Sequence, residues 1–170
     1  MRTIASTIGI LYILALCYSL FPSRRLNRRI LADKIVVRKG ARKLELWSGG
    51  KKVKTYRIAL GKNPVGAKQF EGDMRTPEGI YIIDGKNPNS AFYLNLGISY
   101  PDNKAMALAE AMGKKPGSAI KIHGLRNGLG WRGRFHRTKD WTAGCIAVTN
   151  IEMEELYRAV PVGTPIHIYS

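Results

Sequence analysis

The sequence contains very little cysteine. Only Cys17 and Cys145 occur in 170 residues, which is too few for a framework of disulfide bonds. Cys17 lies within an apolar N-terminal run, so we do not expect it to meet the other thiol. Cys145 is therefore either an inert packed thiol or a reactive nucleophile, and its neighbours must decide between the two.

Acidic residues are also scarce. The sequence has 12 Asp and Glu against 28 Lys and Arg, a formal net charge of +16. Such a surface attracts polyanions, namely nucleic acid, anionic lipid headgroups or an anionic cell wall. Nine of the basic residues fall between Arg24 and Lys43, beside an apolar segment, where lipid headgroups can balance their charge. We expect no nucleic acid, and a non-catalytic polyanion-binding module is the lesser alternative.

Charge is absent altogether from residues 3–21. This run of nineteen residues reaches the lower limit for a helix that spans a bilayer, and no small-x-small cleavage site follows it. We predict an N-terminal transmembrane helix that serves as a membrane anchor or signal segment over 1–23, a basic linker over 24–32 and one folded domain over 33–170. The positive-inside rule would place the Arg24–Arg29 side of the segment in the cytoplasm.

From residue 33 onward, short alternating apolar segments separated by turn residues predict a mainly β domain. Two short helices are also expected. One runs from an Asp102 cap to about Met112, and the other runs from a Thr149–Glu152 capping box to Pro161. Strands are predicted at 34–37, 43–47, 53–60, 80–84, 92–96, 119–123 and 165–169, with a Gly49-Gly50 hairpin turn between the second and the third.

A nucleophilic thiol needs a base, because a free thiol is mostly protonated near neutrality. His123 ends an apolar strand, and the carbonyl of Gly124 after it can orient a ring nitrogen. His136 lies in a glycine- and arginine-rich loop over 125–139, a poor place for a base. His167 alternates with two isoleucines and is expected to face outward. These residues show no short ligand spacing, so we expect no metal site.

The loop over 125–139 combines basic and aromatic residues, including Trp131 and Phe135. It is either a lid over an anionic substrate or a solvated surface loop. Gly144 lets a group approach the Cys145 backbone closely, because it carries no Cβ. The N–H groups of both residues would then lie where an oxyanion forms. A neighbouring imidazolium would lower the pKa of the Cys145 thiol.

Four segments together resemble the catalytic domain of the L,D-transpeptidases, the YkuD-like family. They are Ile122-His123-Gly124 followed by Thr142-Ala143-Gly144-Cys145-Ile146, Gly72–Tyr81 with its Thr-Pro-x-Gly sequence, and Gly163–Ile166. The resemblance covers about 33–169 and implies a mixed-sheet β-sandwich or barrel-like fold. It also implies Cys145 as nucleophile, His123 as general base, the Gly124 carbonyl as its orienting group, and the amides of Gly144 and Cys145 as oxyanion donors, with no cofactor.

The resemblance further implies a peptidoglycan stem peptide as substrate, attacked at the carbonyl of meso-diaminopimelate or its equivalent. An acyl-enzyme thioester is then resolved by an amine or by water, in cell-wall biogenesis or remodelling. Ala143 and Ala147 replace a His and an Arg that are usual in the family. The Asp-Trp-Thr-x-Gly-Cys form resembles a branch that includes an enzyme cutting a lipoprotein from peptidoglycan. A hydrolase acting on such links is therefore the main alternative.

This chemistry implies a bacterial inner-membrane protein whose catalytic domain faces the periplasm and cell wall, against the positive-inside bias. Expected partners are stem peptides, the membrane and a wall-linked lipoprotein.

Overall fold

The computed structural model of the chain describes residue 13 and residues 25–170. The transmembrane helix predicted over 1–23 lies, apart from Ile13, outside the described residues. Within the described part of the chain, no helix is both long enough and apolar enough to cross a bilayer.

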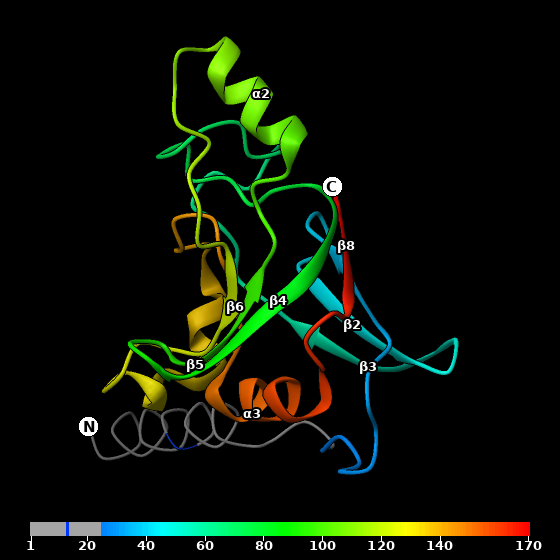
Figure 1. Cartoon of the computed structure of the whole chain (residues 1–170). Coiled ribbons are helices and arrows are strands. Elements are labelled where there is room, and N and C mark those ends of the chain that lie inside the picture. Colours follow the sequence, from blue (N-terminus) through cyan, green and yellow to red (C-terminus); the bar gives the residue numbers. More distant parts are fainter. Residues whose placement is uncertain (1–12, 14–24) are drawn as a thin grey trace, which may run out of the picture.

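The domain is built on one mixed, eight-stranded sheet that curls on itself (Figure 1). Its spatial order is β3-β2-β1-β8-β4-β5-β6-β7. The β1–β8 and β6–β7 pairs are parallel, and the other neighbours are antiparallel. The strands are β1 (Lys34–Arg38), β2 (Lys43–Ser48), β3 (Lys51–Arg57), β4 (Gly79–Ser90), β5 (Tyr93–Ile98), β6 (Lys121–His123), β7 (Ile146–Ala147) and β8 (Pro165–Tyr169).

The curled sheet is nearly closed by the segment that follows β3. Ala59 pairs with Ala147 and Gly61 pairs with Thr142 in isolated bridges, so the chain after one edge strand reaches the other edge. The mainly β fold with one mixed sheet, predicted from the sequence, is confirmed, and the sheet curls into a half-barrel. The finer description as a sandwich or a barrel stays a prediction.

Most of the predicted strands are present, and the β2–β3 hairpin turns at Gly49 and Gly50, both with positive φ. The largest difference is β4, which was predicted over 80–84 and continues to Ser90. Its Gly-, Asn- and Pro-rich second half was interpreted as a turn. Register shifts in its pairing with β5, between Ile83 and Gly85 and between Asn87 and Ser90, absorb these residues into the ladder. The two-residue β7 was not predicted.

Both predicted helices form, and they lie at opposite ends of the sheet (Figure 1). In α2 (Asn103–Ala111), the Asp102 side chain accepts a hydrogen bond from the Ala105 amide. In α3 (Asn150–Ala159), Thr149 and Glu152 form the capping box. The apolar face of α3 is buried as predicted, but the predicted core face of α2 is only half right, because Leu108 and Met112 are each 44% exposed.

The hydrophobic core fills the inside of the curl and is covered at one end by α3. Strand residues such as Ile35, Leu46 and Ile122 contribute to it, together with Met153 and Leu156 of α3. All five side chains are fully buried. The core therefore gives β6 and its neighbours a rigid base, and β6 ends in His123.

Candidate active site

The pairing of β6 with β7 brings His123 and Cys145 to one cavity. Ile122 lies opposite Ile146, and His123 lies opposite Ala147, so Cys145 enters β7 beside the end of β6. Both side chains line a cavity of about 990 Å³. In this structure the Cys145 thiol donates to the carbonyl of Ala119 at a sulfur–oxygen distance of 3.6 Å, and not to His123. The two residues therefore share the cavity in a resting arrangement.

His123 is oriented by the backbone of its own strand end. Its Nδ1 lies 2.7 Å from the Gly124 carbonyl oxygen. A carbonyl can only accept, so Nδ1 carries the proton and Nε2 keeps the lone pair of a base. The ring packs against both Phe92 and Trp141, with centroid distances of 4.8 and 5.7 Å. The tautomer that a general base requires is thus built into the local fold.

The position of Gly124 is itself constrained. A Cβ there would lie 2.8 Å from the Asn150 side-chain oxygen and 3.1 Å from the Phe92 carbonyl. The same Asn150 oxygen accepts a hydrogen bond from the Leu125 amide, at 2.8 Å. Asn150, at the start of α3, therefore braces the peptide whose carbonyl holds His123.

Gly144 occupies a backbone conformation that disfavours other residues, with φ of +132°. A Cβ at this position would lie 2.7 Å from the Arg75 carbonyl oxygen. Thr142 stabilises the turn, because its hydroxyl accepts from the Gly144 amide at 3.1 Å and donates to the Cys145 carbonyl at 2.7 Å. The Gly144 amide, expected as an oxyanion donor, is thus already engaged within the turn in this structure.

The electrostatic environment keeps both reactive groups neutral. Burial raises the pKa of the Cys145 thiol, and the Lys121 backbone N–H, the Lys121 charge and the Lys68 charge offset this in part. Burial also lowers the pKa of His123, against the raising effect of its bond to the Gly124 carbonyl. The low thiol pKa predicted from the sequence is therefore wrong, since an apolar cavity disfavours the thiolate and the imidazolium alike.

The predicted basic loop is ordered as a 3₁₀ segment, η1 (Gly130–Thr138), kinked at Gly133. Trp131 and Phe135, which the sequence singled out, both line the cavity. Arg137 instead forms an ion pair with Glu152, the capping residue of α3. This segment is part of the cavity wall, yet Trp131 is 65% exposed and Phe135 is 43% exposed. The lid and the solvated surface loop therefore both stay predictions.

His136 is the residue that the sequence interpretation misplaced. It is 7% exposed and lines the cavity. Its Nδ1 accepts a long hydrogen bond, 3.4 Å, from Trp141 Nε1. Burial, with Arg137 and His123, lowers its pKa to about 3, so it is neutral at physiological pH. The η1 segment turns His136 toward Trp141. The spacing of these two residues in the sequence matches neither helical nor strand periodicity, so no local pattern predicted their contact.

The other expected residues lie away from the reacting atoms. His167 is half-buried on β8, where it alternates with buried Ile166 and Ile168 as predicted. Ala147 is fully buried and does not line the cavity, whereas Ala143 is exposed and does. Among residues 25–170, no three His, Cys, Asp or Glu side chains form a cluster that could hold a metal ion.

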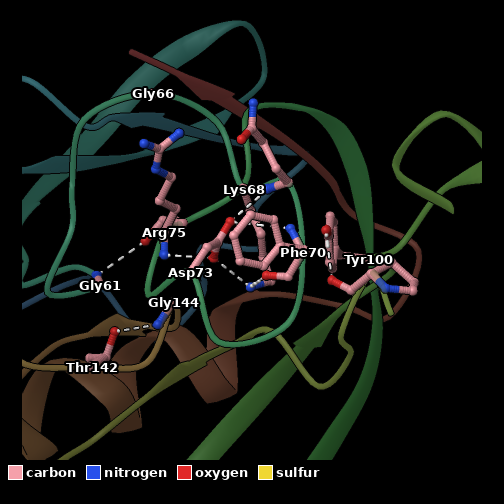
Figure 2. A network of polar contacts seen from close by, with 12 residues as sticks. Gly61, Gly66, Lys68, Phe70, Asp73, Arg75, Tyr100, Thr142 and Gly144 are labelled. Atoms are coloured by element: carbon pink, nitrogen blue, oxygen red, sulfur yellow. Dashed lines mark hydrogen bonds and ion pairs between the residues drawn. The ribbon is translucent and has the colours of Figure 1, made fainter. Parts of the chain in front are cut away.

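A network centred on Asp73 holds the loop that faces Gly144 (Figure 2). Asp73 accepts hydrogen bonds from the amides of Gln69, Phe70 and Arg75, and its Oδ1 lies 2.8 Å from Lys68 Nζ. Both members of this ion pair are about 95% buried at their side chains. Burial alone would raise the pKa of Asp73, but the amides and Lys68 hold it below its ordinary value.

Replacing Asp73 with Ala is expected to lower the free energy of unfolding by about 3–5 kcal/mol, because it leaves the Lys68 ammonium buried without a counter-charge. Chemical denaturation at pH 7 measures this loss. Since the folded-state pKa of Asp73 is lowered, the carboxylate stabilises the fold above its unfolded pKa. The difference in the free energy of unfolding between wild type and Asp73→Ala should therefore become smaller as pH falls through the folded-state pKa of Asp73.

The exposed Glu71 two residues away is the matched control. Glu71→Ala is expected to change the free energy of unfolding by less than about 0.5 kcal/mol. Equal losses of unfolding free energy in the two variants would show that the Lys68–Asp73 ion pair contributes no more to stability than the exposed Glu71 carboxylate does.

The YkuD family, the L,D-transpeptidase catalytic domain, matches residues 32–168. The chain therefore belongs to this family. A curated relative, "Putative L,D-transpeptidase YafK" of Escherichia coli K12, is 28% identical over 108 residues, covering 62% of this chain and 36% of the relative.

Solved structures share the fold. The helical cell shape determining protein Pgp2 (K307A mutant) of Campylobacter jejuni matches with a TM-score of 0.63 at 24% identity, covering 84% of this chain and 48% of that one. Bd1075 of Bdellovibrio bacteriovorus matches with a TM-score of 0.57 at 25% identity, covering 84% and 49%. The chain thus spans about half of these structures and about a third of the curated relative.

Proposed function

We propose that the protein is a cysteine-dependent L,D-transpeptidase that acts on peptidoglycan stem peptides through an acyl-enzyme thioester. The observation that carries the proposal is the geometry of His123 and Cys145. They line one cavity, and the Nδ1 proton of His123 is committed to the Gly124 carbonyl. This leaves Nε2 as the base for a neighbouring thiol. Membership of the family supplies the substrate class.

In the first half-reaction, the Cys145 sulfur bonds to the substrate carbonyl carbon while the thiol proton passes to His123 Nε2. The C–N bond then breaks, and His123 returns the proton to the leaving amine. In the second half-reaction, an amine or water attacks the thioester, its proton passes to His123, and the Cys145 thiol is regenerated. The Cys145 amide is the oxyanion donor in this scheme, and the Gly144 amide joins it when its bond to Thr142 is released.

Burial favours the neutral form of both Cys145 and His123 at rest, so a preformed thiolate–imidazolium pair is disfavoured. This favours a mechanism in which His123 acts as general base during the attack, unlike one with a preformed thiolate–imidazolium pair. The cavity also excludes water from part of the reacting region, because His123 is 5% exposed beneath aromatic rings.

The second candidate is a hydrolase that cuts peptide or lipoprotein links to peptidoglycan. The small Ala143 at the cavity surface favours it, because that position leaves room beside Cys145 for a bulkier leaving group. The branch of the family to which the Asp-Trp-Thr-x-Gly-Cys sequence points stays a prediction. The peptidoglycan substrate lies outside the cytoplasmic membrane, so the proposal places the folded domain, residues 33–170, on the cell-wall side. The positive-inside rule applied to Arg24–Arg29 favours the opposite orientation.

Incubation of the purified protein with muropeptides tests the proposal. Mass spectrometry is expected to find a thioester on the Cys145 peptide, together with cross-linked or exchanged products when an amine acceptor is present. Products that incorporate water alone, even with acceptor in excess, would identify the hydrolase. Absence of both thioester and products, with salt-sensitive polyanion binding retained, would favour the binding module instead.

A further inference from the structure

Within residues 25–170, the cavity beside Cys145 is lined by cations and by no carboxylate. Its charged lining residues are Lys121, Arg126, Arg132 and Lys139. No Asp or Glu is among the residues that line it. A site of this kind attracts an anionic ligand and disfavours a cationic one, because partly excluded water screens the charges poorly.

Lys121 has no carboxylate partner, in contrast to five other partly or fully buried cations of the domain. Those cations each form an ion pair with a carboxylate, in the pairs Lys39–Glu78, Arg42–Asp140, Lys54–Glu155, Lys68–Asp73 and Arg137–Glu152. Lys121 is half-buried, yet its ammonium makes no ion pair or hydrogen bond with any residue of 25–170. The Lys121 side chain lines the cavity, so its ammonium is accessible to a ligand that enters there. The absence of an internal partner points to one that comes with a ligand.

Lys121 also lies close to the reacting atoms. It is two residues before His123 on β6, so the two side chains project from the same face of the strand. Both line the cavity together with Cys145. The Lys121 charge acts on the ionisation of both His123 and Cys145. A group bound by this ammonium therefore lies beside the bond that the thiol attacks.

We propose that Lys121 binds a free carboxylate of the peptide substrate and thereby selects substrates that carry this group next to the scissile bond. This inference rests on the proposed function for the identity of the peptide. A stem peptide has several free carboxylates, on side chains and at its C-terminus, and the same ammonium can bind each of them. The experiment therefore separates these sources.

Binding is measured by calorimetry in the full-length protein carrying Cys145→Ala, so that no turnover intervenes. The ligands are a stem peptide containing meso-diaminopimelate and analogues in which each free carboxylate in turn is a primary amide. With Lys121 present, one amide is expected to weaken binding about 10- to 100-fold, the range for losing a hydrogen bond between charged groups. That analogue identifies the carboxylate that Lys121 binds.

When Lys121→Gln is added to the Cys145→Ala protein, the unmodified peptide is expected to bind as weakly as the critical amide analogue binds to the protein with Lys121. Amidation of the same carboxylate should then weaken binding no further. Lys121→Arg should keep the discrimination. Lys51→Gln, which removes an exposed lysine of the β2–β3 hairpin outside the cavity, should keep it fully. The proposal is overturned if no amide weakens binding to the protein with Lys121, or if the discrimination survives in Lys121→Gln.

A general effect of the lost charge on the thiol would not imitate this result, because the thiol is absent from the Cys145→Ala background. Failure of the proposed function has a different signature, the absence of a thioester in the muropeptide experiment. The two hypotheses can therefore fail separately.

Discussion

Cys145→Ala is expected to abolish thioester formation and every product of the muropeptide reaction, with a loss of about 10⁶-fold in turnover, as when the nucleophile of a protease triad is removed. The physical reason is that, among the described residues, Cys145 is the one thiol that lines the cavity shared with His123. Liquid chromatography with mass spectrometry of the products measures the loss. The variant should keep the stability of wild type to within about 1 kcal/mol, because a half-buried thiol is a small change.

Two variants sharpen this prediction. Cys17→Ala is the matched control, because it removes the other thiol of the chain, and it should retain full activity. Cys145→Ser should recover little, since a hydroxyl is far less acidic and a far poorer nucleophile than a thiol. Substantial turnover by Cys145→Ala would contradict the assignment of the nucleophile.

His123→Gln is expected to lower kcat by about 10²- to 10⁴-fold, the usual contribution of a positioned general base. Gln keeps a polar side chain of similar length and cannot take the thiol proton. The effect should fall on the acylation step, which single-turnover measurement of thioester formation isolates. His167→Gln is the matched control, because His167 is the half-buried histidine of β8 and lies outside the cavity.

The pH profile gives this prediction a second readout. Burial lowers the pKa of His123, so the neutral base form persists below the ordinary histidine pKa of about 6.5. Activity of the wild type should therefore hold at pH 6.5 and fall at more acidic pH, as His123 becomes protonated. That acid limb should disappear in His123→Gln and persist in His167→Gln. An unchanged limb in His123→Gln would remove His123 from the role of base.

Much of the fold follows from local signals. The Asp102 cap, the Thr149–Glu152 capping box and the Gly49-Gly50 turn are each formed by residues within a few positions of one another, and all three are confirmed. Local rules fail where pairing with a distant strand competes with them. The second half of β4 is rich in turn residues, yet β5 draws it into the sheet as far as Ser90.

Some properties of the candidate site were likewise predictable from local sequence, whereas others depend on tertiary packing. The sequence by itself determined the chemical types, a thiol after Gly144 and a histidine before Gly124, because these depend on residue identity and on adjacent peptides. It also supplied the family resemblance, which the match over 32–168 confirms. It did not determine the ionisation of the two groups, which depends on how deeply each is buried.

Burial, and the neighbours that distant segments bring, were decided by the tertiary structure. It turned η1 into a cavity wall, placed His136 against Trp141, and left Lys121 without a carboxylate beside the thiol. It also reversed the expected shift of the Cys145 pKa, since the cost of desolvating a thiolate outweighs the nearby positive charges. These properties arise from packing between residues far apart in the chain, which no local pattern encodes.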